Sequence, residues 1–477
     1  MRTLVVLLSF FTMSVVSAQE SCNCQSELDF VIDYYEKNLP GFSDNVNSKN
    51  QKQYLEFKAD LLEASKKVSN EVECFKIITF FVEFFKDNHS KISMSMPSID
   101  DNNKEEITAF LNSDLFKSRE TYNLTKPDLK QYPESDIRGL YTTANHAYTI
   151  AVIPNKGLMH DYIGVIVDSK TKLWKKGQVK LEIKLTDDGN NVAFVYMKNH
   201  SLRYYNRFPL YNGILGDGWY KTSKTELVNP AINSKEEFDV RKINDSTVYL
   251  KIQTFSGSQT SKINALYEKA KPLITSAPYL LIDVRNNGGG SDKNAIPLLD
   301  YMYTNPIKGD QVDLYVTKDN IKMWEHWYSS ISKDTLNYGE DVRTWFKELI
   351  NTMKASELNS FVLRDKAGTL EMENILKTPK KILIIQNRYC ASSCETLLFW
   401  AKQSDKTILV GENSGGYVGY GEVGSIKTPC YNFDLFCTMT RYNNQRKYEV
   451  IGVTPDYRLN YQDDWIKQSL NILYKKD

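Results

Sequence analysis

The sequence predicts an α/β fold in which a layered sheet domain follows a helical region and a small antiparallel β domain. Three patterns support this prediction: apolar residues at helical spacing before residue 100, alternating strands between 137 and 215, and strand–turn–helix repetition from about 237. The 477 residues are enough for two or three domains. We therefore expect a helical region at 19–100, an antiparallel barrel or sandwich at 137–215, and a core at 237–477.

The helical region is predicted from amphipathic spacing. Ser26 is a plausible N-cap, and Leu28, Val31, Ile32 and Tyr35 follow it at i, i+3, i+4 and i+7. A second helix is expected around 54–62. A third, very apolar helix is expected over 74–85 and ends in the polar stretch 86–90.

In the middle region apolar and polar residues alternate as in β-strands, and in the last region strand and helix patterns follow each other in turn. Strand patterns occur at 148–152, 163–167 and 179–183, and Asp187-Asp188-Gly189 is a hairpin turn signal. After a polar, linker-like stretch at 216–236, buried strands are expected at 247–252, 279–284, 381–386 and 408–410. Helices are expected at 262–270 and 395–402.

Composition limits the classes of partner. Lys and Arg number 60 and Asp and Glu 59, so the formal charge is only +1. Nucleic-acid grooves and acidic lipid surfaces need clustered positive charge, so we expect neither partner. Hydrophobic residues make up 41% of the chain, which indicates a globular protein with a substantial core.

The first residues indicate export. Arg2 precedes the apolar run 4–16, and the small residues of 16–18 offer a cleavage site. This pattern predicts a signal peptide at 1–18, because the run is shorter than the roughly 20 residues that a membrane span needs. We expect a periplasmic or extracellular protein with no integral membrane span after cleavage.

Export makes disulfides possible among the seven cysteines. Cys430 and Cys437 could close a short hairpin, and Cys22 or Cys24 could join Cys74. An odd number leaves at least one thiol free or paired elsewhere. No CxxC or HExxH spacing occurs, so we expect no metal and no cofactor.

A candidate nucleophile lies at 390–395, Cys-Ala-Ser-Ser-Cys-Glu, between a buried strand and an apolar helix. A rigid strand would fix the position of the nucleophile there, and the helix N-terminus would offer unpaired N–H groups to an oxyanion. The alternative is that Ser392 or Ser393 only caps the helix.

A second motif, at 281–290, ends in three glycines after a buried strand. Such glycines allow close backbone approach to a ligand or intermediate. A phosphate-binding loop does not fit, because the GxxxxGK[ST] spacing is missing. A plain turn remains the alternative for this motif alone.

Together, 281–290, 390–395 and Gly411-Glu412-Asn413-Ser414-Gly415-Gly416 resemble the tail-specific, or C-terminal processing, serine peptidases. The resemblance extends over roughly 240–460. It implies the layered β-β-α core shared with crotonase-like proteins. It also implies Ser392 as the nucleophile, with Ser393 as the next candidate.

One departure from that family points to a different general base. The Ser/Lys branch has a Lys 25 residues after the nucleophile, where this chain has Tyr417; Lys402 and Lys406 are weak substitutes. The stretch 87–90 resembles the DGHS-type stretch of the tricorn-like branch, and 449–456 resembles its Glu-containing segment. This resemblance implies His89 as base and Glu449 as the acidic residue; Ser90 follows the His here, so its part in the relay is left open.

The implied oxyanion donors are the amides of Ser393 and of Gly288 or Gly289. The sequence therefore predicts an exported serine endopeptidase that acts on a protein or peptide substrate through an acyl-enzyme. The alternative is a catalytically silent peptide- or ligand-binding protein on the same fold, which the Tyr417 substitution motivates.

Overall fold

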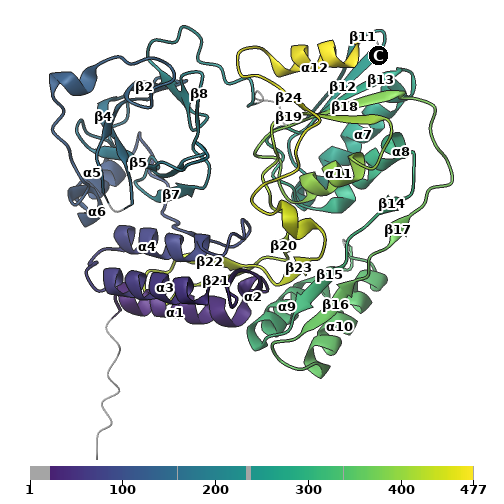
Figure 1. Cartoon of the computed structure of the whole chain (residues 1–477), viewed down its shortest axis with the longest axis horizontal. Helices are drawn as coiled ribbons and strands as arrows, with labels where there is room; N and C mark the ends of the chain where they lie inside the picture. The colour runs from purple at the N-terminus through teal and green to yellow at the C-terminus, as the bar shows by residue number, and fades with distance from the viewer. Residues whose placement is uncertain (1–21, 158, 233–237, 337, 476–477) are drawn as a thin grey trace, which may run out of the picture.

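The computed structural model describes residues 22–157, 159–232, 238–336 and 338–475. Three parts surround the centre of the molecule: an N-terminal helical layer, a β domain above it, and the α/β core beside both (Figure 1). The predicted signal peptide at 1–18 lies outside the described residues, and so does part of the polar stretch 216–236. No helix in the described part is long and apolar enough to cross a membrane.

The helical layer buries the faces that the spacing predicts. Its helices are α1 (Cys24–Asn38), α2 (Phe42–Asn45), α3 (Gln51–Ser65) and α4 (Glu71–Glu83). Helix α1 begins earlier than expected: Asn23 is the N-cap and accepts from the Ser26 amide, while the Ser26 hydroxyl returns to the Asn23 backbone. Ser26 is thus the third helical residue of a reciprocal cap and not the cap itself.

A small sheet joins this layer to the distant C-terminal part of the chain. Strand β1 (Lys91–Ser93) pairs antiparallel with β22 (Asp434–Cys437), which pairs with β21 (Gly424–Lys427). The disulfides Cys22–Cys430 and Cys24–Cys74 hold the same region together. The expected Cys430–Cys437 pair is wrong, because Cys430 is bonded to Cys22 and Cys437 is a buried free thiol.

The β domain is one antiparallel sheet that curls round on itself (Figure 1). Its strand order is β7-β6-β5-β4-β3-β2-β10-β9-β8, so β7 and β8 are the two edges. The bounds are β2 (Gly139–Thr143), β3 (Tyr148–Pro154), β4 (Tyr162–Ser169), β5 (Val179–Lys184), β6 (Val192–Tyr196), β7 (Leu202–Tyr205), β8 (Leu210–Tyr211), β9 (Ile214–Leu215) and β10 (Trp219–Lys221). Helices α5 (Lys104–Asn112) and α6 (Asp114–Lys117) precede it.

The core is a six-stranded sheet of order β11-β12-β13-β18-β19-β24, parallel except for β11. Its strands are β11 (Phe238–Asn244), β12 (Thr247–Ile252), β13 (Tyr279–Asp283), β18 (Lys381–Gln386), β19 (Thr407–Gly411) and β24 (Tyr457–Arg458). Helices α7 (Thr260–Thr275), α8 (Leu299–Met302) and α11 (Ser393–Ala401) pack on one face, and α12 (Trp465–Leu473) packs on the other. This layered α/β arrangement is the predicted fold class.

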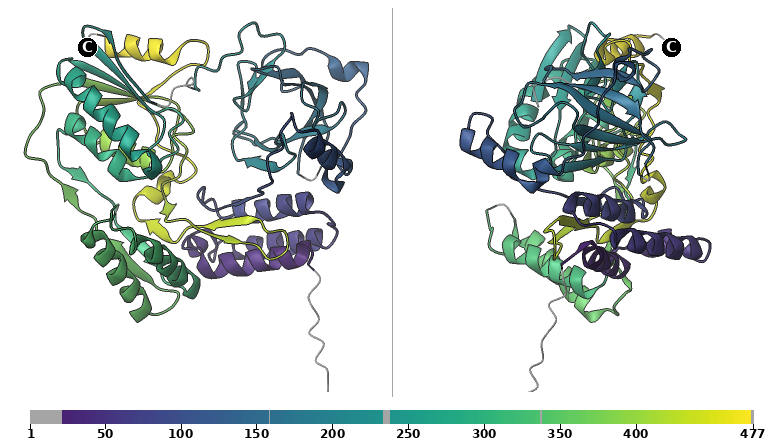
Figure 2. Two further views of the ribbon diagram at one scale, coloured as in Figure 1. Left: turned by 180° about the vertical axis from the view of Figure 1, so that it is seen from behind. Right: turned by 90° about the vertical axis from the view of Figure 1, so that its left-hand side faces the viewer.

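A lobe extends from the core, formed mainly by the segment between β13 and β18 and completed by two strands from later in the chain. Figure 2 shows its two helices beside a small sheet, apart from the main sheet. The elements are β14 (Ile307–Lys308), β15 (Val312–Tyr315), α9 (Lys318–Ile331), α10 (Glu340–Ala355), β16 (Phe361–Asp365), β17 (Thr369–Leu370), β20 (Tyr420–Gly421) and β23 (Thr440–Tyr442). Strands β16, β15, β23 and β20 form its sheet.

Candidate active site

The turn between β18 and α11 presents Ser392 in a strained backbone conformation. Ser392 is the N-cap of α11, with φ 56° and ψ −124°. A non-glycine residue in this region costs about 1–3 kcal/mol and persists only where its surroundings fix it. The disulfide Cys390–Cys394 spans the turn on both sides of Ser392. The expectation that Ser392 caps the helix and the expectation that it is the nucleophile are therefore both compatible with its position.

The Glu395 side chain fixes the turn that carries Ser392 through hydrogen bonds. Its fully buried carboxylate accepts hydrogen bonds from the Ser392 amide (3.0 Å) and from the Ser414 hydroxyl (2.5 Å). It also accepts from the amides of Gly416 and Tyr417, both at 2.8 Å. Burial raises the pKa of Glu395, and these donors oppose that shift. One side chain thus joins the nucleophile turn to the following loop.

The glycine-rich loop packs directly on this turn. A Cβ on Gly289 (φ +86°) would lie 2.5 Å from the Ala391 carbonyl oxygen and 2.9 Å from Ser392 Cβ, so only glycine fits. The Gly289 amide donates to Asn287 Oδ1 at 2.9 Å. Of the two predicted glycine donors, Gly288 is the one that lines the cavity with Ser392.

Ser393 differs from Ser392 in the environment of its hydroxyl. Ser393 is 6% exposed, and its side chain hydrogen-bonds to the carboxylate of Asp292, an exposed residue at the rim of the cavity. Its position at the first turn of α11 leaves its amide without an intrahelical acceptor. This arrangement favours Ser392 as the nucleophile and Ser393 as an amide donor.

His89 reaches the same cavity from the helical layer. Its ring, the glycine-rich loop and Ser392 all line a cavity of about 800 Å³. The Nδ1 atom is buried without a hydrogen-bond partner among the described residues. Burial lowers the pKa of His89, whereas the charge of Asp87 and the Tyr420 carbonyl oppose this shift. The ring is therefore kept neutral, as a general base must be.

Asp87 organises the backbone around His89. Its carboxylate, 4% exposed, accepts from the His89 amide (3.0 Å), the Ser90 hydroxyl (2.6 Å) and the Thr438 hydroxyl (2.6 Å). The Ser90 hydroxyl in turn accepts from the Thr438 amide at 3.2 Å. In this structure the Ser90 hydroxyl donates its hydrogen bond to Asp87, and a part for Ser90 in the relay stays a prediction.

Glu449 lies beside the His89 loop and binds its backbone. Its carboxylate accepts from the amides of Asn88 (2.9 Å), Val418 (2.9 Å) and Gly419 (2.5 Å). Burial, followed by the charge of Asp87, raises the pKa of Glu449. Glu449 thus joins residues 87–90, which carry His89 and are called the base loop below, to the 418–419 segment. No hydrogen bond between the Glu449 carboxylate and the imidazole is found among the described residues.

Tyr417, the residue in the position of the family's Lys, packs edge-on against the His89 ring with centroids 5.2 Å apart. Burial raises the pKa of Tyr417 to about 12, so it remains a neutral phenol. The amines of the other two candidates bond elsewhere: Lys402 to Asp456 at 3.0 Å, and Lys406 to the Leu376 carbonyl. His89 is the remaining candidate base in this cavity.

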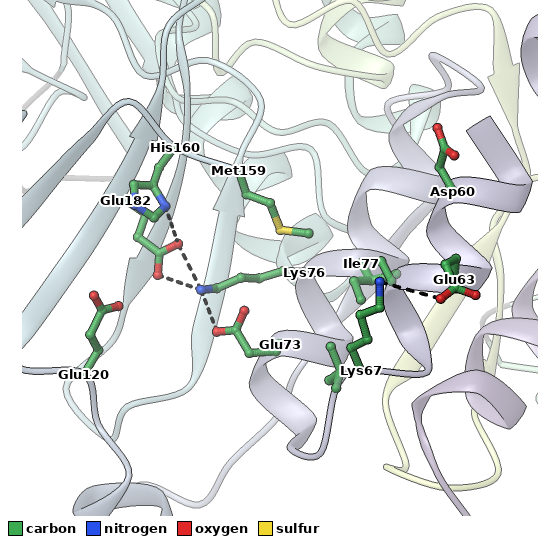
Figure 3. Close-up of a pocket in the computed structure, with 12 residues that line it drawn as sticks. Asp60, Glu63, Lys67, Glu73, Lys76, Ile77, Glu120, Met159, His160 and Glu182 are labelled. Atoms are coloured by element: carbon green, nitrogen blue, oxygen red, sulfur yellow. Dashed lines mark hydrogen bonds and ion pairs between the residues drawn. The ribbon is translucent and has the colours of Figure 1, made fainter. Parts of the chain in front are cut away.

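A second cavity, of about 570 Å³, lies between α4 and the β domain. There Lys76 bridges Glu73 (2.9 Å) and Glu182 (2.7 Å), as Figure 3 shows. His160 lies 3.5 Å from Glu182. The buried charges of this cavity are paired with one another, so it joins two parts of the protein and shows no nucleophile–base pair. No group of three or more His, Cys, Asp or Glu residues in the described part of the chain could hold a metal ion.

The sequence analysis missed Asp87 and Glu395 as organising residues. Glu395 stands three positions after Ser392, which is the reciprocal capping spacing. Asp87 stands two positions before His89, the spacing of a side chain that folds back on its own backbone. Both signals are local and could have been found.

Comparisons with known proteins show which family part of the chain resembles. Residues 246–459 match the model of peptidase family S41. Mature CPAF covers 94% of this chain and 96% of its own, at 13% identity and a TM-score of 0.49. A putative peptidase from Parabacteroides merdae covers 95% and 98% (12% identity, TM-score 0.44), and the photosystem II D1 C-terminal processing protease covers 92% and 93% (12%, 0.36). No curated protein sequence matches. Residues 246–459 are thus similar to peptidase family S41, and the protein is a serine-type peptidase.

Proposed function

We propose that the protein is an exported serine endopeptidase in which Ser392 is the nucleophile and His89 the general base. The observation that carries the proposal is that His89 and Ser392, from distant parts of the chain, line one cavity. Ser392 lies in a strained turn at a helix N-terminus, and the half-buried His89 has a buried Nδ1 with no hydrogen-bond partner among the described residues.

The reaction is acyl transfer to the Ser392 hydroxyl. Oγ attacks the peptide carbonyl, its proton passes to the His89 ring, and the tetrahedral oxyanion receives hydrogen bonds from the amides of Gly288 and Ser393. The imidazolium then gives its proton to the leaving amine, which breaks the C–N bond. Water then attacks the acyl-enzyme while neutral His89 again acts as general base, and the proton returns to Ser392 Oγ as the ester bond breaks.

Two carboxylates support the base by charge and by position. Asp87 raises the proton affinity of His89 and fixes its backbone, and Glu449 holds the adjacent Asn88 amide. Glu449 acts here as a positioning residue for the base loop. The tricorn-like pattern also implies Glu449 as the acidic residue of the relay.

Export is supported by the bonding of the cysteines. Cys22 and Cys24, just after the proposed signal peptide, are both in disulfides, and a third disulfide spans the nucleophile turn. Disulfides persist in oxidising compartments, so a periplasmic or extracellular location fits these pairs. We propose signal-peptide cleavage near residue 18.

The test uses a serine-reactive phosphonate probe and a fluorogenic peptide. Ser392→Ala is expected to abolish both labelling and cleavage, whereas the matched Ser393→Ala is expected to keep labelling because its amide remains. His89→Ala is expected to lower kcat by at least about 10³-fold. Full labelling of Ser392→Ala, or normal cleavage by His89→Ala, would contradict these assignments.

A further inference from the structure

Two strand edges without a neighbour face the same groove beside the catalytic cavity. Strand β1 pairs only with β22, and β7 pairs only with β6, in the described part of the chain. Figure 1 shows β7 on the side of the β domain nearest α4 and the small sheet. Residues of both strands line a cavity of about 800 Å³. Free backbone N–H and C=O groups thus line a space large enough for a peptide.

The two walls of this groove are tied together at both ends. Asn206 Nδ2 donates to Asn88 Oδ1 at 3.0 Å at one end. At the other, Asn199 Nδ2 donates to the carbonyls of Met96 (3.0 Å) and Pro97 (2.9 Å). Because 88–96 and 199–206 thus run in opposite directions, their edges lie antiparallel with the groove between them.

The groove carries positive charge without a carboxylate partner. Lys91 from β1 and Arg203 from β7 both line it, and both are exposed. No ion pair to either cation is found among the described residues. Partial desolvation of the ammonium group, followed by the charge of Arg203, lowers the pKa of Lys91, so the two charges repel each other. An anion between them would relieve this repulsion.

The carboxyl group of Glu83, which also lines the groove, does not supply that anion. Burial, followed by the charge of Asp87, raises the pKa of Glu83 to about 8, and Glu83 is hydrogen-bonded to Tyr204. At neutral pH this group is mainly protonated. The remaining lining is apolar or neutral and includes Met94, Met96 and Met197.

The groove leads to the catalytic cavity. Tyr417 lines both spaces, and Asn88, at the tied end, directly precedes His89. A chain held between the strands would therefore pass Tyr417 on its way to Ser392. The cations lie between the two tied ends, so such a chain continues past them in both directions.

We propose that this groove holds an extended segment of the peptide substrate, paired with the free edges of β1 and β7, with an acidic side chain between Lys91 and Arg203. The inference rests on the proposed peptidase function and adds a specificity subsite to it. Strand addition supplies affinity through the backbone, and the two cations supply selectivity for Asp or Glu. A C-terminal carboxylate is not required, because the cations lie along the groove.

The test compares peptides that differ in one carboxylate. A set of amidated fluorogenic peptides carries a single Glu that is moved along the sequence, each matched with a Gln peptide. We expect one position at which the Glu/Gln ratio of kcat/KM reaches about tenfold, mainly through KM, and at which added salt reduces it. Arg203→Glu and Lys91→Glu are expected to bring that ratio to one or below.

The matched control is Lys176→Glu, a charge reversal at an exposed turn of the same β domain. It should leave the Glu/Gln ratio as in the wild type. Equal ratios in the wild type and both groove variants would overturn the subsite, and so would a preference that follows a free terminal carboxylate and not the side chain. Probe labelling of Ser392 in every variant separates failure of the subsite from failure of the catalytic assignment.

Discussion

The two halves of the proposed active site are held in place in different ways. The nucleophile turn is fixed within its own domain by a disulfide, a glycine contact and the buried Glu395 carboxylate. The base loop is fixed from outside: Asp87 binds Thr438, and Glu449 binds Asn88, both across the interface between the helical layer and the C-terminal part. The nucleophile should therefore resist disturbance of the helical layer, and the base should not.

Among the residues that hold the two halves in place, the largest effect is expected from Glu395→Ala. The change removes the carboxylate that accepts four hydrogen bonds and leaves the four donors without this acceptor. The turn therefore loses the group that fixes the Ser392 backbone. We expect kcat/KM to fall by at least about 10²-fold, as for a misplacement of about 1 Å. Loss of a buried charged acceptor should also lower the free energy of unfolding by about 3 kcal/mol.

Glu395→Gln is the matched control for that change. It keeps one acceptor oxygen but turns an N–H₂ group toward donor amides, so its activity should lie between those of the wild type and the alanine variant. Urea unfolding and peptide cleavage measure the two quantities. A Glu395→Ala variant with normal cleavage would show that the turn does not depend on this carboxylate.

The next effect is expected from Asp87→Asn, which weakens the base loop but not the nucleophile turn. His89 would lose both an anchoring acceptor and a nearby negative charge. We expect kcat to fall by about 10²-fold, while the fluorophosphonate probe still reaches Ser392 at a reduced rate. Equal loss of activity and of folded protein would instead indicate a structural role only, so circular dichroism accompanies the assay.

This contrast also explains what the sequence could predict. The nucleophile turn is contiguous in the chain: strand, turn and helix follow each other over 381–401, so local pattern indicated a nucleophile or a helix cap at Ser392 or Ser393, and the family resemblance selected Ser392. The fold class followed in the same way from periodicity.

The surroundings of His89 could not be inferred locally. Its loop is completed by Thr438, and that contact depends on β1 pairing with β22 across the whole chain. The resemblance therefore left the part of Ser90 open, and in the folded protein the Ser90 hydroxyl donates a hydrogen bond to Asp87. The long-range pairing of β1 with β22 determines the hydrogen-bond partners of Asp87 and Ser90.

A third prediction tests the attachment of the helical layer to the β domain. Lys76 and Glu182 are 5% and 2% exposed, so Glu182→Ala removes the buried partner of the ammonium group and leaves it only the more exposed Glu73. We expect the free energy of unfolding to fall by about 3–5 kcal/mol, with kcat of the folded protein changed less than by Asp87→Asn. The control is Asp33→Ala, which breaks the exposed Lys37–Asp33 pair and should cost at most about 1 kcal/mol. Similar costs for both variants would show that the buried pair adds no attachment.

The smallest effect concerns the acid limb of the pH–rate profile, and it reports on the base alone. Cleavage needs neutral His89, and burial lowers the pKa of His89 below its usual value of about 6.5, so activity should persist below pH 6.5 and fall only as pH drops through the lowered pKa. Asp87 opposes that lowering, because a nearby anion stabilises imidazolium. Asp87→Asn should therefore move the acid limb of the remaining activity to still lower pH, whereas Glu395→Gln should leave it in place. A limb above pH 6.5 would contradict the lowered pKa of His89, and a limb that shifts equally in both variants would show that the base and the nucleophile are not held independently.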